Sequence, residues 1–275
     1  MNNQLQNKPK FSLAIQSEGY KRLINNTLGD PKRAAKFIAA ISSAVATNSS
    51  LQQCDAGSIL SGALLGEALN LSPSPQLGQY YLVPFKDKAQ FQLGYKGYIQ
   101  LAIRSGQYKD IDVIEVREGE YLGRDKITGK HQFEFIEDEV ERENKPIIGY
   151  MAYFEYLNGF YKNLYWSKEK MQKHALEYSQ AYASDVKKGT NYSFWTKDFN
   201  GMAFKTMLRQ LISKWGIMSI DMQEALTKDM SVVKEDGTYD YVDNQPVMEV
   251  PSEERVEQTA ETTTIEVKQV NINEL

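Results

Sequence analysis

The chain has 275 residues with a net charge of −4, which allows one large domain or two small ones with a sizeable core, and its composition is ordinary for a soluble globular protein. It has no run of 18 apolar residues, and no apolar stretch follows its polar start, MNNQLQNKPK, so we expect neither a membrane-spanning helix nor a secretory signal. The single cysteine, Cys54, excludes an intrachain disulfide and favours a reducing, cytoplasmic location.

The net charge conceals a segregation along the chain. From Asp229 to Leu275 there are 12 acidic and 3 basic residues, a net of −9, which leaves 29 basic and 24 acidic residues, a net of +5, in the rest. The pattern indicates a mildly basic body with an acidic tail. A solubilising tail on an ordinary body accounts for it as well as a basic binding surface does.

The first part of the chain predicts a polar, irregular segment followed by two helices. Residues 1–29 show no clear periodicity. Asp30 can then cap a helix, and Pro31 suits its first turn. A second helix is expected over residues 55–71, where SPSPQLG stops it because prolines and a glycine cannot continue a helix.

The middle of the chain predicts strands around one amphipathic helix. QYYLVPF (79–85) and the run at 86–95 are expected strands, and GYKGYIQLAIRSGQ (94–107) is expected to be a helix that Gly106 ends. Alternating residues predict further strands over 109–120 and 129–139. The clearest signal is Asn158-Gly159 between two aromatic-rich runs, which is typical of a β-hairpin over 147–166.

The last part predicts helices and then a tail. We expect a helix capped by Ser167, a loop over 179–193, a long helix over 194–216 and a final helix over 221–230. The order of elements predicts an α+β fold with a twisted, mostly antiparallel sheet packed against several helices. The expected organisation is a polar N-terminal segment (1–29) with a possible part in subunit contacts, a core domain (30–230) and an acidic disordered tail (231–275).

Catalytic motifs are missing from the sequence. His131 and His174, the only histidines, have no metal-ligand spacing with Cys54 or with each other, and no phosphate loop, G-x-S-x-G or H-E-x-x-H occurs. The carboxylate-rich EFIEDEVERE resembles a solvated edge more than a magnesium site. We therefore expect a protein that is not an enzyme and has no cofactor, with no evident Mg²⁺ site.

The amphipathic segment at 94–107 is the strongest binding candidate. Lys96, Gln100 and Arg104 recur at i, i+4 and i+8 on one face, whereas Tyr95 and Tyr98 belong to the apolar stripe. The polar row is either a solvated face or a track for phosphates. The two tyrosines are either core residues or platforms for stacked bases.

Four blocks of this sequence resemble segments of the RecT-type single-strand annealing proteins. LGYKGYIQLAIRSGQ is similar to the family segment L-G-Y-[KR]-G-x-I-x-L-A-x-R-S-G-Q, and the other three are ALNLSPSPQLGQYYLVPF, VREGEYL and WTKDFNGMAFKTMLRQL. The blocks run in family order from about Ala34 to Trp215. Both chain ends lie outside them, and 123–130 looks like an insertion.

The resemblance implies a phage or prophage recombination protein of the kind carried by Gram-positive prophages. Such proteins bind single-stranded DNA, pair it with a complementary strand and hold the annealed duplex without ATP, as rings or helical filaments. They accompany a 5′-to-3′ exonuclease, and host single-strand-binding protein is a further possible partner. The competing hypothesis is a DNA-binding adaptor that recruits a recombination nuclease without pairing strands.

With an annealing function, the polar rows become candidate DNA contacts. A basic groove holds phosphates and leaves base edges free to pair. Gly94 and Gly97 then either allow close approach of a strand or a neighbouring subunit, or serve tight helix–sheet packing. The predicted DNA-binding residues are Lys96, Gln100, Arg104, Lys109, Arg117, Lys205, Arg209 and Lys214, with Tyr95, Gly97 and Tyr98 as candidates for stacking or close approach.

A modest positive excess also predicts assembly. Few phosphates can meet one subunit, so a continuous track requires many subunits along one strand. We expect a head-to-tail contact that closes into a ring or continues as a filament.

Overall fold

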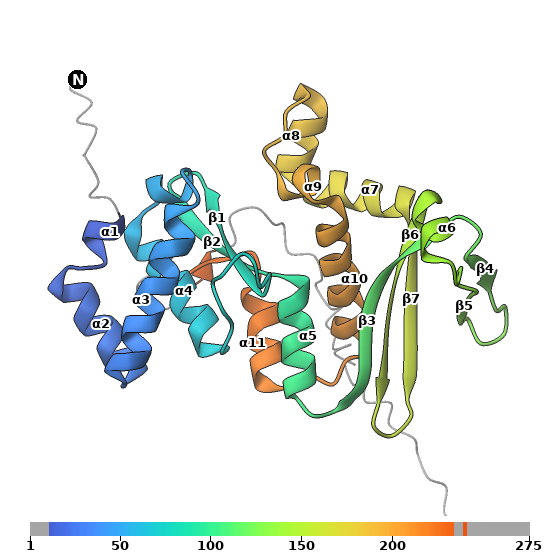
Figure 1. The fold of residues 1–275 in the computed structure, drawn as a ribbon, viewed down its shortest axis with the longest axis horizontal. Helices are drawn as coiled ribbons and strands as arrows, with labels where there is room; N and C mark the ends of the chain where they lie inside the picture. Colours follow the sequence, from blue (N-terminus) through green and yellow to red (C-terminus); the bar gives the residue numbers. More distant parts are fainter. Residues whose placement is uncertain (1–10, 234–238, 241–275) are drawn as a thin grey trace, which may run out of the picture. The chain divides into compact units, whose positions relative to one another are not determined.

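The computed structural model describes residues 11–233 and 239–240 (Figure 1). Its helices are α1 (Phe11–Ala14), α2 (Glu18–Leu28), α3 (Pro31–Ala46), the 3₁₀-helix η1 (Leu51–Gln53), α4 (Ala56–Ala68), α5 (Tyr95–Arg104), α6 (Glu139–Asn144), α7 (Lys168–Tyr178), α8 (Gln180–Lys188), α9 (Phe194–Lys197), α10 (Phe199–Trp215) and α11 (Ile220–Lys228). Its strands are β1 (Tyr80–Phe85), β2 (Lys88–Leu93), β3 (Tyr108–Arg117), β4 (Tyr121–Arg124), β5 (His131–Phe133), β6 (Ile147–Tyr156), β7 (Tyr161–Ser167), β8 (Val232–Val233) and β9 (Tyr239–Asp240). None of these helices is long and apolar enough to cross a membrane.

The strands confirm the predicted α+β class and its antiparallel pairing. β3, β6 and β7 form one sheet in the order β3-β6-β7, while β1–β2, β4–β5 and β8–β9 are separate pairs. The predicted hairpin is present as β6–β7, and Gly159 in its turn has a φ of +82°, which a residue with a side chain rarely adopts. The strands thus form several small sheets rather than one.

Helices cover these sheets with the apolar faces that their periodicity predicts. α10 packs on β3, β6 and β7 and also contacts α5, while α4 packs on β1 and β2. On the apolar face of α10, Leu208 and Leu211 are fully buried, and Phe204 and Trp215 are half-buried against the same core. The core therefore runs from α4 through β2 and α5 to α10 and β6.

The N-terminal segment differs from the prediction because α1 and α2 are helical. Phe11, Ile15 and Ile24 are buried in the core. Ser17 caps α2 by accepting from the Tyr20 amide, and Gly29 ends it in the left-handed region at a φ of +65°. Such short helices are barely stable alone, so it is the burial of these apolar residues in the core that stabilises the segment.

The region before α10 also differs from the prediction. The expected loop over 179–193 contains α8, and the expected long helix over 194–216 is divided into α9 and α10 at Asp198. Asp198 has an extended φ of −145°, and its carboxylate accepts from the Gly201 amide at 2.9 Å. Aspartate commonly prefers this capping role to a position inside a helix.

The predicted tail begins too early. Ser231 and Val232 are buried, and the chain here pairs with Phe91 of β2. The Phe91 amide donates to the backbone oxygen of Ser231 at 2.8 Å, and the Met230 amide donates to the backbone oxygen of Phe91 at 2.8 Å. The folded body therefore continues past residue 230 along β2. Apart from β8 and β9, the rest of the predicted disordered tail lies outside the described residues.

One buried carboxylate connects four parts of this core. Asp229, directly after α11, is 1% exposed. Its Oδ1 accepts from the Leu93 amide of β2 at 2.8 Å and from Lys205 Nζ at 2.9 Å. Its Oδ2 accepts from the Tyr98 hydroxyl at 3.1 Å and from Arg209 Nη1 at 2.7 Å. Asp229 thus joins β2, α5 and α10 to the end of α11.

The surrounding donors keep Asp229 ionised. Burial raises the pKa of this carboxyl, but Lys205, Arg209 and the hydrogen bonds lower it more, so the net pKa lies below the usual aspartate value. A carboxyl with a lowered pKa in the folded state stabilises the fold above its unfolded pKa of about 3.9, and this stabilisation is lost as the pH falls through the folded pKa.

We predict that Asp229→Asn lowers the free energy of unfolding by about 3–5 kcal/mol, because the Lys205 ammonium stays buried without its counter-charge. Urea unfolding at neutral pH measures the change. The double variant Asp229→Asn/Lys205→Met is the control and should lose less than the sum of the two single losses, since it removes both charges. A single variant within 1 kcal/mol of the wild type would contradict the role of this ion pair.

Candidate nucleic-acid interface

Helix α5 presents the predicted polar row to solvent. Lys96, Gln100 and Arg104 are all exposed, whereas Tyr98 and Leu101 on the opposite face are buried. Lys96 forms no ion pair with any described residue; its ammonium lies 5.9 Å from the centre of the Tyr95 ring. The row therefore offers an unpaired cation at one end of α5.

Arg104, at the other end of the row, is oriented by the end of α4. Its Nη2 donates to the Leu69 oxygen at 2.6 Å, and its Nη1 donates to the Asn70 oxygen at 3.4 Å. Arg33 of α3 reaches the same helix end, where its Nε pairs with Glu67 at 2.6 Å. The two guanidinium groups complement the negative end of the α4 dipole, and Arg104 remains exposed beside it.

The two glycines at the start of α5 are explained by packing within the chain. A Cβ added to Gly94 would lie 2.1 Å from the Gly78 oxygen, and one added to Gly97 would lie 2.1 Å from the Gln79 oxygen. Gly97 is buried, so it offers no surface for a DNA strand. Of the two explanations open from the sequence, tight packing of α5 against the start of β1 is the one that the structure supports.

The tyrosines of α5 also have internal partners. Tyr98 is fully buried and donates to Asp229, and the half-buried Tyr95 packs its ring edge-on to Phe204 with 5.5 Å between ring centres. Tyr98 cannot stack on a base in this conformation, because no part of its ring reaches the surface. Tyr95 keeps only part of its surface available.

Lys205 and Arg209 of α10, both predicted DNA contacts, form ion pairs within the protein in this conformation. Lys205 is 5% exposed, and its ammonium is held by Asp229; Arg209 binds the same carboxylate and is only partly exposed. Lys205 is therefore buried in the core, away from any surface that a DNA strand could reach, whereas the partly exposed Arg209 stays a predicted DNA contact. The sequence does not reveal this pairing, since Asp229 follows the next helix along the chain.

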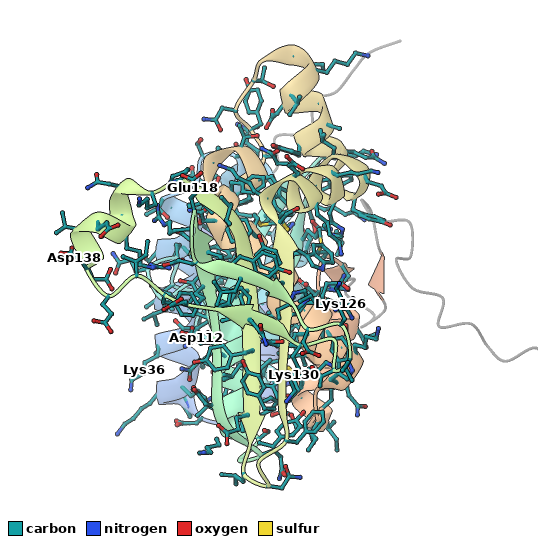
Figure 2. All side chains as sticks on the ribbon, turned by 90° about the vertical axis from the view of Figure 1, so that its right-hand side faces the viewer. Lys36, Asp112, Glu118, Lys126, Lys130 and Asp138 are labelled. Carbon is teal, nitrogen blue, oxygen red and sulfur yellow. The ribbon has the colours of Figure 1, made fainter. Side chains whose placement is uncertain are left out.

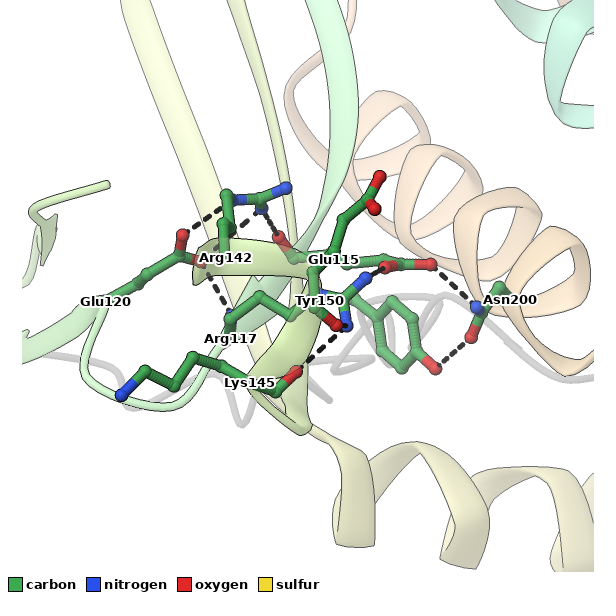
Figure 3. Close-up of polar contacts among 8 residues, drawn as sticks. Glu115, Arg117, Glu120, Arg142, Lys145, Tyr150 and Asn200 are labelled. Carbon is green, nitrogen blue, oxygen red and sulfur yellow. Dashed lines mark hydrogen bonds and ion pairs between the residues drawn. The ribbon is translucent and has the colours of Figure 1, made fainter. Parts of the chain in front are cut away.

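Arg117 is bound into the polar network of Figure 3. Its Nη2 pairs with Glu115 of the same strand at 2.8 Å, and its Nη1 donates to the Lys145 oxygen at 2.9 Å. Glu115 also accepts from the Asn200 amide at 2.6 Å, which links β3 to α10. Arg117, a predicted DNA contact, thus has a carboxylate partner on its own strand.

The same network explains part of the carboxylate-rich run. Glu120 is fully buried, and the Arg142 side chain of α6 binds its carboxylate at 2.6 Å. Arg142 also donates to the backbone carbonyl oxygen of Glu115 at 2.7 Å (Figure 3). The run at 134–143 thus includes the short helix α6, which Arg142 fastens to β3. Among the described residues, no group of three or more His, Cys, Asp or Glu side chains is placed to hold a metal ion.

The remaining predicted contacts lie on the strand and helix ends. Lys109 is exposed and pairs with Glu155 at 2.7 Å. Lys214 is exposed, and its ammonium lies 4.7 Å from the centre of the Trp215 ring, as does that of Lys162 on β7. Lys109 and Lys214 do not belong to the α5 row, so they stay separate predicted contacts besides the exposed Lys96, Gln100 and Arg104.

Comparison with known protein families assigns the chain to a family. The model of the RecT family matches residues 35–246. The chain belongs to the RecT family. This confirms the resemblance seen in the sequence blocks, and it extends that resemblance beyond Trp215, so part of the acidic segment lies within the family match.

Two curated relatives agree with this assignment. The chain is 42% identical over 212 residues to "Uncharacterized protein YqaK" of Bacillus subtilis (strain 168), which covers 77% of this chain and 68% of the relative. It is 30% identical over 193 residues to "Protein RecT" of Escherichia coli (strain K12), which covers 65% of each chain. RecT family membership supports a role in DNA recombination and single-strand annealing.

We predict that Gly97→Ala destabilises the fold, because the new methyl group would overlap the Gln79 backbone oxygen, which cannot move without shifting β1. The midpoint of thermal unfolding should fall by several degrees, as a loss of about 1–3 kcal/mol implies. Gly19→Ala in α2 is the matched control: nothing lies within 4 Å of its added Cβ, so its midpoint should be unchanged or slightly higher. Equal midpoints for the two variants would disprove the packing explanation.

Proposed function

We propose that this RecT family protein is an ATP-independent single-strand annealing protein of homologous recombination. The observation that carries the proposal is the exposed row of Lys96, Gln100 and Arg104 on α5, in the segment that most closely resembles the family pattern. The row lies on a helix whose other face is held by the hydrogen bond from the Tyr98 hydroxyl to Asp229. A rigid row can hold a DNA strand in one orientation.

The chemistry of the row suits annealing. Lysine and arginine attract phosphates regardless of sequence, and the glutamine amide can donate to a phosphate or sugar oxygen. Contacts to the backbone leave the base edges free to pair with a second strand. Neither ATP nor a metal ion is needed for this step, because the free energy of base pairing drives it. On this proposal the protein is not an enzyme, and magnesium would act only on the strands.

The proposed assembly is a head-to-tail oligomer, ring or filament, in which the rows of neighbouring subunits follow one DNA strand. Multiple linked contacts would hold a strand that one short row cannot. The cognate exonuclease and host single-strand-binding protein are proposed partners in the cytoplasm of a bacterial host, on the strength of the family resemblance alone.

We predict that Lys96→Ala weakens single-strand binding without lowering thermal stability, because Lys96 is exposed and has no ion-pair partner in the described structure. Losing one phosphate contact should reduce the slope of log affinity against log salt by about 0.7. Fluorescence anisotropy of a labelled oligonucleotide over a salt series measures it. Lys126→Ala in the turn between β4 and β5 (Figure 2) removes the same charge elsewhere and is the control. A slope shared by wild type and both variants would mean that the row is a solvated face.

We predict that the protein accelerates duplex formation between two complementary labelled oligonucleotides in the absence of any nucleotide. Energy transfer between the labels gives the rate, and the mass of the protein alone, with one strand and with both strands in sequence reports assembly. Strands that are coated but not paired would favour the adaptor hypothesis, and shortened strands would indicate a nuclease. Annealing by a protein that stays monomeric throughout would contradict the shared groove.

A further inference from the structure

The segment from α7 to α9, which includes the loop between α8 and α9, has the chemistry of a second strand-binding surface. Residues 168–197 contain six lysines, all exposed, against two exposed carboxylates, Glu169 and Glu177, and one buried one, Asp185. No ion pair within the described residues neutralises any of these lysines. They are Lys168, Lys170 and Lys173 of α7, Lys187 and Lys188 at the end of α8, and Lys197 of α9. A dense, unpaired positive charge of this kind favours a polyanion.

Tyr192 in the same loop projects an aromatic ring into solvent. It is 79% exposed, which is unusual for a side chain that gains from burial. Among the described tyrosines, Tyr80, Tyr98 and Tyr150 are fully buried, so Tyr192 is not part of the core that uses most of the aromatic content. An exposed ring beside lysines can stack on a base while the ammonium groups bind the flanking phosphates.

The buried Asp185 carboxylate holds this loop in one conformation. Its Oδ2 accepts from the amides of Tyr192 at 3.0 Å and Ser193 at 2.7 Å, and from the Thr196 hydroxyl at 2.7 Å. Its Oδ1 accepts from the Thr190 hydroxyl at 2.7 Å. The Thr190 hydrogen bond, followed by those of the other donors, lowers the pKa of Asp185 against the effect of burial. These hydrogen bonds fix the backbone of the loop at Tyr192 and Ser193, so the backbone that carries the exposed ring is held in place.

The loop lies beside the start of the α5 row. Phe194, two residues after Tyr192, packs on Tyr81 of β1 with 5.8 Å between ring centres. The Tyr81 hydroxyl and Lys96 Cδ both lie close to Gly78, at 3.2 and 3.3 Å from the position of its added Cβ. Tyr81 thus packs on Phe194, and it and Lys96 both lie against Gly78. α8 and α9 lie next to the N-terminal end of α10 (Figure 1).

We propose that Lys187, Lys188 and Tyr192 form a second contact for single-stranded DNA, continuous with the α5 row through Tyr81. Tyr192 stacks on one base, and the two lysines bind the phosphates on either side of it. This inference rests on the proposed function, because it assigns the same strand a longer path across the subunit. It also gives the protein a contact to a base that is independent of the DNA sequence, since every base has a stacking face.

The first test separates stacking from charge. Tyr192→Ala should bind an oligothymidine strand about tenfold more weakly than wild type, and it should bind an abasic strand of equal length with unchanged affinity. Tyr192→Trp should restore binding, because it keeps a stacking face. Ile127→Ala, which removes a 96% exposed apolar side chain from the β4–β5 turn, is the control and should bind as wild type does. Equal affinities of Tyr192→Ala and Ile127→Ala for oligothymidine would overturn the stacking role.

The second test concerns the lysines. Lys187→Ala/Lys188→Ala should reduce the salt slope of binding by about 1.4, with thermal unfolding unchanged. Lys126→Ala/Lys130→Ala removes the same charge from the β4–β5 turn (Figure 2) and should keep the wild-type slope. A wild-type slope in the Lys187→Ala/Lys188→Ala variant, with intact binding, would overturn the phosphate role and indicate another acidic partner for this surface.

The outcomes also separate the two proposals. If wild type anneals strands and the loop variants behave as their controls do, the second contact is absent and the proposed function stands. If wild type binds a strand through this loop but fails to anneal, the annealing function is wrong and the loop contact stands.

Discussion

The buried carboxylate of Asp229 is the interaction on which the arrangement of the core depends. A single side chain satisfies an amide at the end of β2, a hydroxyl of α5 and two cations of α10. Each of these groups would be costly to bury alone, because a desolvated polar atom without a partner loses its hydrogen bonds to water. Together they form a satisfied network, so the position of α5 is tied to that of α10 and to the end of α11.

This constraint decides which charges remain available on the surface. Lys205 and Arg209 are committed to the carboxylate, whereas Lys96 on the opposite side of α5 has no ion-pair partner in the described structure. Because Tyr98 is held by the same carboxylate, the rotation of α5 about its axis is set, and its polar row must face outward. The glycines add a second constraint, since they let the start of α5 approach the backbone of residues 78 and 79.

A second carboxylate-centred network performs the same task around β3. Glu120 and Glu115 gather Arg117, Arg142 and Asn200, so the short helix α6 and the start of α10 are fastened to one strand. Asp185 likewise accepts hydrogen bonds from several donors of the loop after α8 and so fastens that loop. In each case an acidic residue organises donors from segments that are otherwise only partly apolar. The carboxylates of Asp229, Glu120, Glu115 and Asp185 thus serve the fold.

The sequence by itself determined the local features whose physics is local. The spacing of Lys96, Gln100 and Arg104 sets a row on any α-helix, Asn158-Gly159 favours a turn with a positive φ, and Asp30 before Pro31 favours the start of a helix. Tertiary structure decided the rest. Lys205 and Arg209 follow the same helical spacing as an exposed row, yet they are partners of Asp229, because a carboxylate beyond the next helix folds back onto them. Likewise the burial of Ser231 and Val232 depends on β2, which is distant along the chain, and no local pattern encodes the free energy of that contact.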